Sequence, residues 1–380
     1  MNILIAAGVP RRREGGVAGI VSNYAEGLQR RGHAVTTVFS DDLMPPHQRS
    51  GRFAELTFAR RLSRFIQEHR AEYSIVNLHA PAGAVYCFRR RFLRRPGPPC
   101  VVTLHGLEEN RIYAMKREHK KDRAKDFSLK NRIWHRLYHQ PRFDVCIRTA
   151  DAVHCFSRDV WAVLRLKYNL DDDRVAFIPN GVDERFFQER QYSSSRPVRL
   201  LFAGTWLEQR GIHYLRDALP GVFSKCPELR MTFAGAGVPG TEIRSFFGPA
   251  AAAHLDILET VPWENMPQLY AEHDILVFPS LVEGQPSVVL EAMASGMPVI
   301  TAETCGMADL IDHGRDGWLV PPADAHAIED GILQLCGSAE LREALGRAAQ
   351  SRMARRTWNR AVEDFETLLE RVFQKAQQRD

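Results

Sequence analysis

Short apolar runs alternate with longer amphipathic stretches along the whole chain. Each apolar run has the length of a buried strand, and the stretch after it carries apolar positions at helical spacing. This alternation is typical of βαβ units and predicts parallel sheets covered by helices. In the first half, strands are predicted at 3–7, 34–39, 75–78, 101–104, 153–156 and 175–178.

The second half repeats the pattern after a polar stretch at 188–197, QERQYSSSRP, which we interpret as a linker. We expect an α/β protein of two facing Rossmann-like domains, 1–190 and 191–354. A final amphipathic helix within 355–380 either completes the second core or crosses back to the first domain. In the second half, strands are predicted at 198–203, 231–234, 256–258, 275–278, 299–301 and 318–320.

Charge is distributed unevenly between the halves. The net charge is +5, but residues 1–190 hold 34 basic and 21 acidic residues (+13), whereas the remainder holds 17 and 25 (−8). Much of the basic excess lies at 11–13, 89–95 and 111–140, where aromatic residues and Leu alternate with Lys and Arg. Such a segment is either a solvated helix face or a surface for an anionic membrane. No nucleic-acid-reading motif accompanies it, so nucleic acid is not an expected partner.

Three features bear on the cellular compartment. The seven cysteines are odd in number and contain no C-x-x-C pair, as is typical of free thiols in a reducing compartment. The start, MNILIAAGVPRRR, places apolar residues before positive charges, the reverse of a secretory signal, and reads as a strand. No apolar run reaches the roughly 18 residues of a membrane span. We expect a cytoplasmic protein, with any membrane contact peripheral.

The segment FPSLVEGQPSVVLEAMASGMPVI, at 278–300, contains the strongest signal for chemistry. A strand ends there, Glu283 lies in the loop, and Pro286 with Ser287 opens a helix. The unpaired amides of Ser287 and Val288 would form a site for an anion such as a diphosphate. Glu291 lies four residues after Ser287, on the same helix face, where its carboxylate can accept two hydroxyls of a ribose.

These residues resemble a family signature. E-G-x-P followed by VVLEAMASGMPVI, with Glu283 and Glu291 at E-x7-E spacing, is similar to the retaining GT-B glycosyltransferases of family four. The resemblance implies two domains around a cleft, a nucleotide-sugar donor such as a UDP- or GDP-sugar, retention of configuration and no bound metal or other cofactor. It also implies donor contacts from Gln285, Pro286, Ser287 and Val288.

Other positions in the second half are compared with the same family. In LLFAGTWLEQRG, Thr205 stands where the family often has Arg, and Arg210 where it often has Lys. Arg210 would then carry the fixed positive charge on the diphosphate. Gly235 and Gly237, in AGAGVPG, resemble the family's glycine turn beside the nucleotide, although a plain turn explains them equally well. Val261 matches the base-contacting loop by position only.

The first half offers fewer such positions. Gly15 and Gly16 resemble a loop that approaches the donor phosphate, or simply start a helix. His105, in VVTLHG, matches the family's histidine near the transferred sugar, and His79 ends the preceding strand and is placed on the acceptor side. Asp171–Asp173 formally contains a D-x-D motif but precedes a strand and is interpreted as a solvated turn.

The resemblance predicts a glycosyltransferase of EC class 2.4 that acts in polysaccharide, lipopolysaccharide or glycolipid synthesis on a glycan or lipid-linked acceptor. Glu283, His105 and Arg210 would be its catalytic residues. Two alternatives stay open: an epimerase or phosphorylase on the same fold, and a basic membrane- or nucleic-acid-binding module. The donor base and sugar, the acceptor, the linkage and the oligomeric state cannot be inferred from the sequence.

Overall fold

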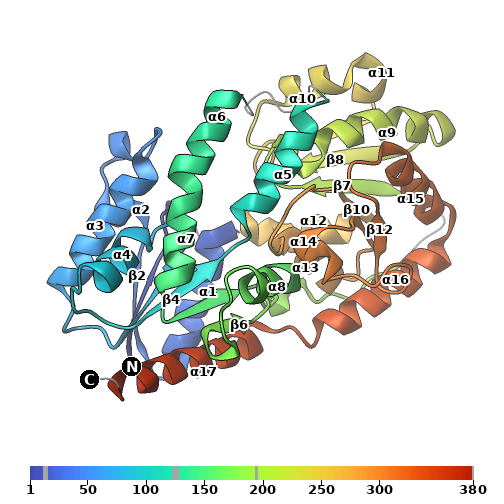
Figure 1. The fold of residues 1–380 in the computed structure, drawn as a ribbon. Helices are drawn as coiled ribbons and strands as arrows, with labels where there is room; N and C mark the ends of the chain where they lie inside the picture. The colour runs from blue at the N-terminus through green and yellow to red at the C-terminus, as the bar shows by residue number, and fades with distance from the viewer. Residues whose placement is uncertain (12–15, 122–127, 193–195, 379–380) are drawn as a thin grey trace. The chain divides into compact units, whose positions relative to one another are not determined.

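The computed structural model describes residues 1–11, 16–121, 128–192 and 196–378 (Figure 1). It divides into two compact units, which are described separately. The first comprises Met1–Ile112, Asp126–Gly181 and Trp358–Asp380, and the second Tyr113–Lys125 and Val182–Thr357. The main boundary thus falls at 181/182, whereas the polar stretch at 188–197 predicted it near 190.

The first unit contains a six-stranded sheet in the order β2-β1-β3-β4-β5-β6, with every neighbouring pair parallel. All residues of β3 and β4 are buried, as expected where helices cover both faces of a parallel sheet. The six strands predicted for this half are confirmed within two residues at each end. They are β1 (Asn2–Ala6), β2 (Ala34–Val38), β3 (Ile75–His79), β4 (Cys100–Leu104), β5 (Ala152–Cys155) and β6 (Val175–Phe177).

Helices cover the two faces of this sheet. Alternate residues of β1 point to opposite sides: Ile3 and Ile5 pack in one cluster with Phe365, and Leu4 and Ala6 in another with Phe58. The helices are α1 (Gly16–Arg30), α2 (Ser40–Leu43), α3 (Ala54–Glu68), α4 (Ala84–Phe92), α6 (Leu129–Trp134), α7 (Gln140–Thr149), α8 (Arg158–Leu166) and α17 (Trp358–Gln377), with one π-helical turn, His135–His139, between α6 and α7. Helix α5 (Glu108–His119) begins in this unit, and its residues from Tyr113 onwards belong to the second.

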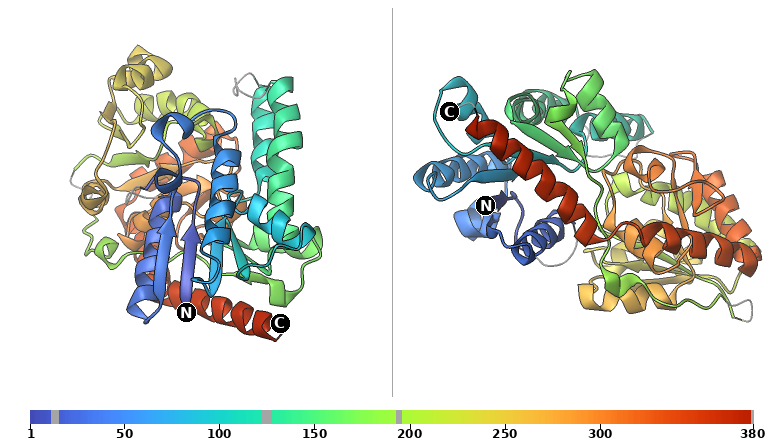
Figure 2. Two further views of the ribbon diagram at one scale, coloured as in Figure 1. Left: turned by 90° about the vertical axis from the view of Figure 1, so that its left-hand side faces the viewer. Right: turned by 90° about the horizontal axis from the view of Figure 1, so that it is seen from below.

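Helix α17 packs on the first unit, although the segment immediately before it in sequence, Val182–Thr357, belongs to the second (Figure 2). Its buried residues include Val362, Phe365, Leu369 and Val372, which form the apolar face that the sequence predicted. Val362 lies so close to Gly27 of α1 that a Cβ added there would come within 2.4 Å of its side chain. The close α1–α17 approach therefore requires glycine at position 27.

The second unit contains a parallel sheet in the order β12-β11-β10-β7-β8-β9. The six strands predicted for this half are confirmed: β7 (Arg199–Ala203), β8 (Arg230–Ala234), β9 (Leu255–Leu258), β10 (Ile275–Phe278), β11 (Val299–Ala302) and β12 (Trp318–Val320). Its helices are α9 (Ile212–Lys225), α10 (Gly240–Phe247), α11 (Pro249–Ala252), α12 (Met266–Glu272), α13 (Ser287–Ala294), α14 (Cys305–Ala308), α15 (Ala325–Gly337) and α16 (Ala339–Met353).

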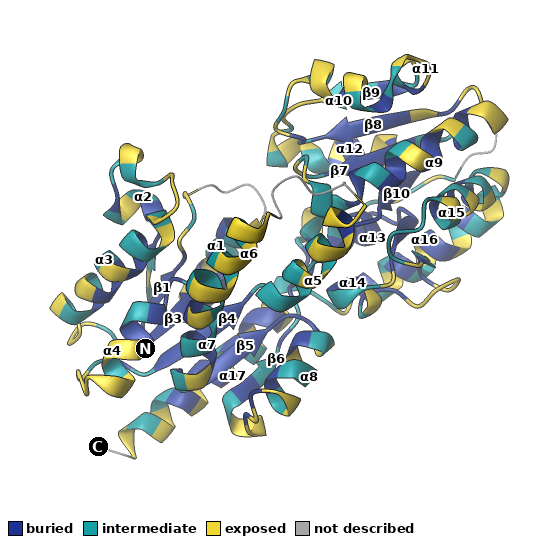
Figure 3. Cartoon of the chain, turned by 45° about the horizontal axis from the view of Figure 1, so that its top comes forward, coloured by how far each residue is buried: buried dark blue, intermediate teal, exposed yellow. Residues whose placement is uncertain are grey.

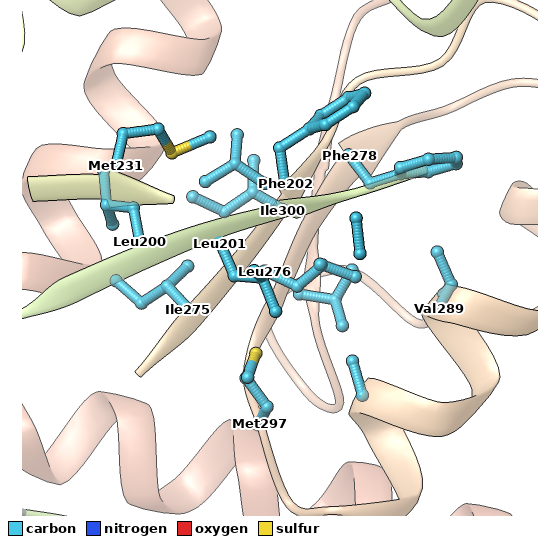
Figure 4. Close-up of a cluster of buried hydrophobic side chains, with 14 of the residues drawn as sticks. Leu200, Leu201, Phe202, Met231, Ile275, Leu276, Phe278, Val289, Met297 and Ile300 are labelled. Carbon is cyan, nitrogen blue, oxygen red and sulfur yellow. The ribbon is translucent and has the colours of Figure 1, made fainter. Parts of the chain in front are cut away.

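The core of the second unit is built around its central strands. Leu200 and Leu201 of β7 and Leu276 of β10 are fully buried, and Val289 of α13 packs in the same cluster (Figure 4). Coloured by burial, the strands of both units are mostly dark blue and the outer helix faces yellow (Figure 3). Helix α13 is thus anchored on the sheet by its apolar residues, which fixes the direction of its first turn.

Part of the predicted linker lies against the second unit. The guanidinium of Arg190 donates to the backbone carbonyls of His273 at 2.6 Å and Ser295 at 3.0 Å, and the Tyr192 hydroxyl donates to the carbonyl of Gly296 at 2.6 Å. Residues 193–195 lie outside the described ranges. The polar composition that suggested a linker therefore includes side chains that satisfy backbone groups of the second unit.

Two further expectations concern charged segments. The second half of α5 belongs to the second unit, because Glu118 is buried there and accepts a hydrogen bond from Tyr214 Oη at 2.6 Å. The acidic triplet 171–173 is an exposed turn, as predicted, with Asp173 beside Lys375 at 3.3 Å. Within the described residues, no helix has both the length and the apolarity to cross a membrane.

Candidate functional site

The loop from β10 to α13 holds most of the predicted donor-binding residues. Helix α13 begins at Ser287, and Pro286 is its N-cap in extended conformation, so the expectation that Pro286 lies in the first turn was wrong by one residue. The Pro286 carbonyl accepts from the amides of Val289 and Leu290. The described residues provide no acceptor for the amides of Ser287 and Val288, which leaves two donors at the positive end of the helix.

Arg210 and Glu283 form an ion pair within this region. Arg210 ends a 3-10 turn after β7, and its Nη1 contacts Glu283 Oε1, to which Ser280 also donates at 3.1 Å. The guanidinium lies over the Phe278 ring, 5.1 Å from its centroid. Burial raises the pKa of Glu283, and the attraction of Arg210 opposes this shift. The two residues predicted on different strands are therefore brought together.

Backbone contacts hold the Arg210 turn against the β10 loop. The amide of Leu281 donates to the Gln209 carbonyl at 2.8 Å, and the Ser280 hydroxyl donates to the same carbonyl at 3.0 Å. Gly211 has φ of 77°, and a Cβ there would lie 2.1 Å from the Pro279 carbonyl oxygen. Only glycine permits this approach, so Gly211 is what places the Arg210 side chain beside Glu283.

Glu291 occupies the second turn of α13 and is bonded to Tyr270 of α12. The Tyr270 hydroxyl donates to Glu291 Oε2 at 2.8 Å, while no described residue donates a hydrogen bond to Oε1. Burial raises the pKa of Glu291 to about 7, with the hydrogen bond from Tyr270 acting in the opposite direction and the charge of Asp183 adding to the rise. The carboxyl group is thus poised between its two protonation states near neutral pH.

Two glycine turns follow the neighbouring strands. Gly235 and Gly237, after β8, both have φ of 71°, which explains glycine there by backbone conformation alone. The amide of Trp206, next to the exposed Thr205, donates to the carbonyl of Ala236 at 2.9 Å, so the loops after β7 and β8 lie side by side. Val261 is partly buried after β9, and Gln285 is buried in the loop before α13.

In the first unit, His79 and His105 form a pair at the carboxyl edge of the sheet. His79 ends β3, and His105 follows β4 directly. His79 Nδ1 lies 2.6 Å from His105 Nε2, and His79 Nε2 is buried without a hydrogen-bond partner. Burial lowers the pKa of His105 to about 3 and that of His79 well below its ordinary value. Both rings are neutral near pH 7, so one donates and the other accepts.

The predicted glycine loop is described only in part. Gly15 lies outside the described residues, as do Arg12 and Arg13. Gly16 is exposed at the first position of α1 with φ of 59°, a conformation that favours glycine.

Metal-compatible groups occur elsewhere in the described chain. Glu108, His135 and His139 form one, and His33, Glu366 and Glu370 another, with ligand atoms within 4.8 Å of each other. In each, a carboxylate is paired with a histidine and an arginine, as Glu108 is with His135 at 2.8 Å and Arg111 at 3.2 Å. None of these residues was predicted as a site residue, and each group has a simple ion-pair interpretation.

Three residues that contact the predicted site residues or lie near them were not found from the sequence. In the second unit, Tyr270 donates to Glu291 and Ser280 donates to Glu283. In the first unit, His154 lies on the strand next to the histidine pair and is bonded to the Ile178 carbonyl at 3.0 Å. Tyr270 comes from a helix with an ordinary apolar pattern, so its hydroxyl carried no signal. His154 has a strand position like that of His79, which was the available clue.

Two family models match the chain. The one described as Glycosyltransferase Family 4 matches residues 14–186, and the one described as Glycosyl transferases group 1 matches residues 197–338. The sulfoquinovosyl transferase SQD2 of Arabidopsis thaliana is 30% identical over 191 residues, which are 48% of this chain and 37% of that protein. The spore coat protein SA of Bacillus subtilis is 25% identical, over 61% of this chain and 68% of its own. These matches span between about a third and two thirds of the relatives' length.

Solved structures share the fold over almost the whole chain. The sucrose-phosphate synthase of Thermosynechococcus elongatus superposes with a TM-score of 0.78 at 18% identity, covering 99% of this chain and 100% of the other. WaaG, a glycosyltransferase of lipopolysaccharide biosynthesis, gives 0.73 at 14% identity, covering 97% and 99%. Anabaena Alr3699/HepE in complex with UDP and glucose gives 0.67 at 18% identity, covering 97% and 98%. With the two family models covering most of its length, the chain belongs to the group 1 glycosyltransferases and has the GT-B fold.

Proposed function

We propose that this protein transfers a sugar from a nucleotide-sugar donor to an acceptor hydroxyl with retention of configuration. The observation that carries the proposal is the arrangement after β10, where an ion-paired Arg210 and Glu283 accompany two unpaired helix amides and a half-buried Glu291. Anion donors, a fixed cation and two carboxylates match the parts of a nucleoside diphosphate sugar: diphosphate, ribose and sugar hydroxyls.

Each residue receives a role from its chemistry. Arg210 and the amides of Ser287 and Val288 would bind the diphosphate and stabilise the charge that builds on it as the sugar leaves. Glu291 would accept the ribose hydroxyls through its unpartnered Oε1. In the free protein Arg210 contacts Glu283; on donor binding it would turn to the diphosphate and release Glu283 for the sugar.

Contacts from the other loops complete the proposed donor site. The turns at Gly235 and Gly237, together with Thr205, would let the backbone approach the nucleotide, and Val261 would contact the base. Gly16 and His105, from the first unit, would contact the phosphate and the transferred sugar, and His79 would act through His105. Because Thr205 carries no charge, Arg210 would be the main cation on the leaving group.

The acceptor and the cellular role are proposed from the relatives. WaaG acts in lipopolysaccharide biosynthesis, and the Salmonella typhimurium relative is described as a putative colanic acid biosynthesis glycosyltransferase. We infer a glycan or lipid-linked acceptor. Exposed Leu129, Ile133 and Leu137 lie among Lys130, Arg132 and Arg136, a composition that supports peripheral contact with an anionic membrane.

The test is a panel of UDP-, GDP- and ADP-sugars, scored by slow hydrolysis and by thermal stabilisation, with Glu291→Ala beside the wild-type chain. We expect one class of donor to stabilise the wild type and to be hydrolysed in the presence of EDTA, with the anomeric configuration of the released sugar retained. Glu291→Ala should lose the stabilisation. A panel without binding or turnover would overturn the proposal, and inversion or EDTA sensitivity would overturn its retaining or metal-independent part.

A further inference from the structure

The first unit contains a surface pocket of about 330 Å³ whose lining is dominated by basic side chains. Five basic residues line it, and they come from four parts of the chain: Arg91 from α4, Arg148 from α7, Arg174 from the turn before β6, and Arg371 and Lys375 from α17. Two carboxylates, Asp151 and Asp173, also line it, which leaves a formal excess of three positive charges. The volume lies at the lower end of the range for small-molecule sites.

The carboxylates of the pocket are already engaged. Asp151 accepts from Arg90, which is not a lining residue, and from the backbone amide of Cys100 at 2.7 Å. Asp173 pairs with Lys375 at 3.3 Å. Among the described residues, no carboxylate lies within ion-pair distance of Arg91, Arg148 or Arg371. The pocket therefore gathers three arginines whose charge no neighbouring acid neutralises.

One cation of the pocket is held rigidly. Arg174 Nη2 donates to the carbonyls of Ala150 at 2.9 Å and Arg148 at 3.1 Å, at the end of α7, where the helix dipole favours positive charge. The guanidinium of Arg148 lies 5.1 Å from the ring centroid of Tyr168. Such supports lower the conformational entropy that a long basic side chain loses on binding an anion.

The pocket is distinct from the predicted histidine site in the same unit. Asp151 precedes β5 and Arg174 precedes β6, so the pocket lies at the amino edge of the parallel sheet. His79 and His105 lie at the carboxyl edge. A four-residue strand such as β5 separates the two edges by roughly 13 Å.

We propose that this pocket binds a phosphorylated ligand, through one phosphate or diphosphate group held by Arg91, Arg148 and Arg371. Arginine guanidinium groups bind phosphate oxygens in a bidentate manner, and several converging arginines favour a doubly charged anion over a carboxylate. The pocket is lined mainly by polar and charged groups, so the phosphate provides most of the recognition. The ligand is either a free phosphorylated metabolite or the headgroup of an anionic lipid, since exposed Phe92 and Leu93 adjoin Arg91.

The probe for the first source is inorganic pyrophosphate, measured by titration calorimetry on the full chain with excess UDP present to occupy any diphosphate site of the second unit. We expect the double variant Arg148→Ala/Arg371→Ala to bind pyrophosphate about tenfold or more weakly than the wild type. The double variant Arg148→Lys/Arg371→Lys should bind with intermediate affinity. The matched control is Arg64→Ala on α3, which removes an exposed arginine from outside the pocket. It should bind as the wild type does.

The second source is tested with vesicles of phosphatidylglycerol in phosphatidylcholine. A headgroup ligand predicts that vesicle binding is lost in the double Ala variant, retained in Arg64→Ala and competed by pyrophosphate. A free metabolite predicts pyrophosphate binding with no pocket-dependent vesicle binding. The proposal is overturned if the wild type binds no pyrophosphate up to about 5 mM, or if all variants bind alike. Equal donor turnover in the Ala variants and the wild type would separate this pocket from the proposed transferase site.

Discussion

The fully buried Tyr270 of α12 donates its hydroxyl to Glu291 of α13, with 2.8 Å between Oη and Oε2. The bond opposes the effect of burial on the Glu291 pKa. It therefore favours the ionised carboxylate, the form that accepts hydroxyl groups on both oxygens.

Tyr270→Phe should raise the pKa of Glu291 further above about 7, because the hydrogen bond that lowers it is lost. UDP affinity should then fall about five- to tenfold at pH 7 and recover at about pH 9, where the carboxyl group ionises without help. Calorimetric titration at the two pH values tests this. Equal weakening at both would mean that Tyr270 acts by shape alone.

Glu291→Gln should change how stability depends on pH. The raised pKa means that the wild-type side chain stabilises the fold fully below about pH 4.5 and that this contribution is lost as pH rises through about 7. The neutral amide does not titrate. When the pH is raised from about 5 to about 8, the unfolding free energy of the variant should therefore rise by about 2–3 kcal/mol relative to that of the wild type. Urea unfolding of both proteins at the two pH values measures this change. Glu242→Gln, at an exposed position, should show no such gain.

Arg210→Ala should destabilise the second unit by about 2–4 kcal/mol near pH 7, because Glu283, with 14% of its side chain exposed, would lose its only cationic partner among the described residues and keep just the hydrogen bond from Ser280. Adding Glu283→Gln should restore more than half of the loss. Denaturant unfolding of the four proteins in the cycle gives the coupling energy. The exposed pair Arg230–Asp256 provides the contrast, with an expected coupling below about 1 kcal/mol. A coupling near zero for Arg210–Glu283 would contradict the buried ion pair.

Gly211→Ala should lower the unfolding free energy by about 2 kcal/mol or more, since φ of 77° and the Pro279 oxygen 2.1 Å from the new Cβ both oppose it. Gly337→Ala is the matched control, because no atom lies within 4 Å of its Cβ position. Thermal unfolding of both variants tests the prediction. If Gly211→Ala were neutral, the turn would not need the approach described.

His79→Phe should lower kcat about tenfold, because it removes the partner that fixes the tautomer of His105. UDP affinity should stay unchanged, because the residues proposed to bind the nucleotide belong to the second unit. Steady-state kinetics and calorimetry separate the two effects. Loss of UDP binding would show that the variant perturbs the fold instead. His79→Asn, which retains a polar group near His105, should recover part of the rate.

The fold was predictable because its signal is periodic. The twelve strands were recognised from apolar runs such as those at 75–78 and 275–278, since strands buried on both faces need apolar residues throughout. The ends of the elements were harder to predict than the elements themselves. Pro286 was predicted inside α13 because Pro suits both an N-cap and a first helical turn. Gln188–Tyr192 was predicted as linker because polar side chains occur in solvated loops as well as in contacts with backbone carbonyls.

The sequence by itself determined two parallel α/β halves, a helix start preceded by a loop carboxylate, and a second carboxylate about one turn after that start. These are local properties: hydrophobic period, proline position and residue spacing within one segment. Only the tertiary structure decided that Arg210 contacts Glu283, that Tyr270 tunes Glu291, that His79 holds His105, and that arginines from four segments converge on one pocket. Those relationships join residues distant in sequence, and they depend on strand order and helix packing, which no local pattern encodes.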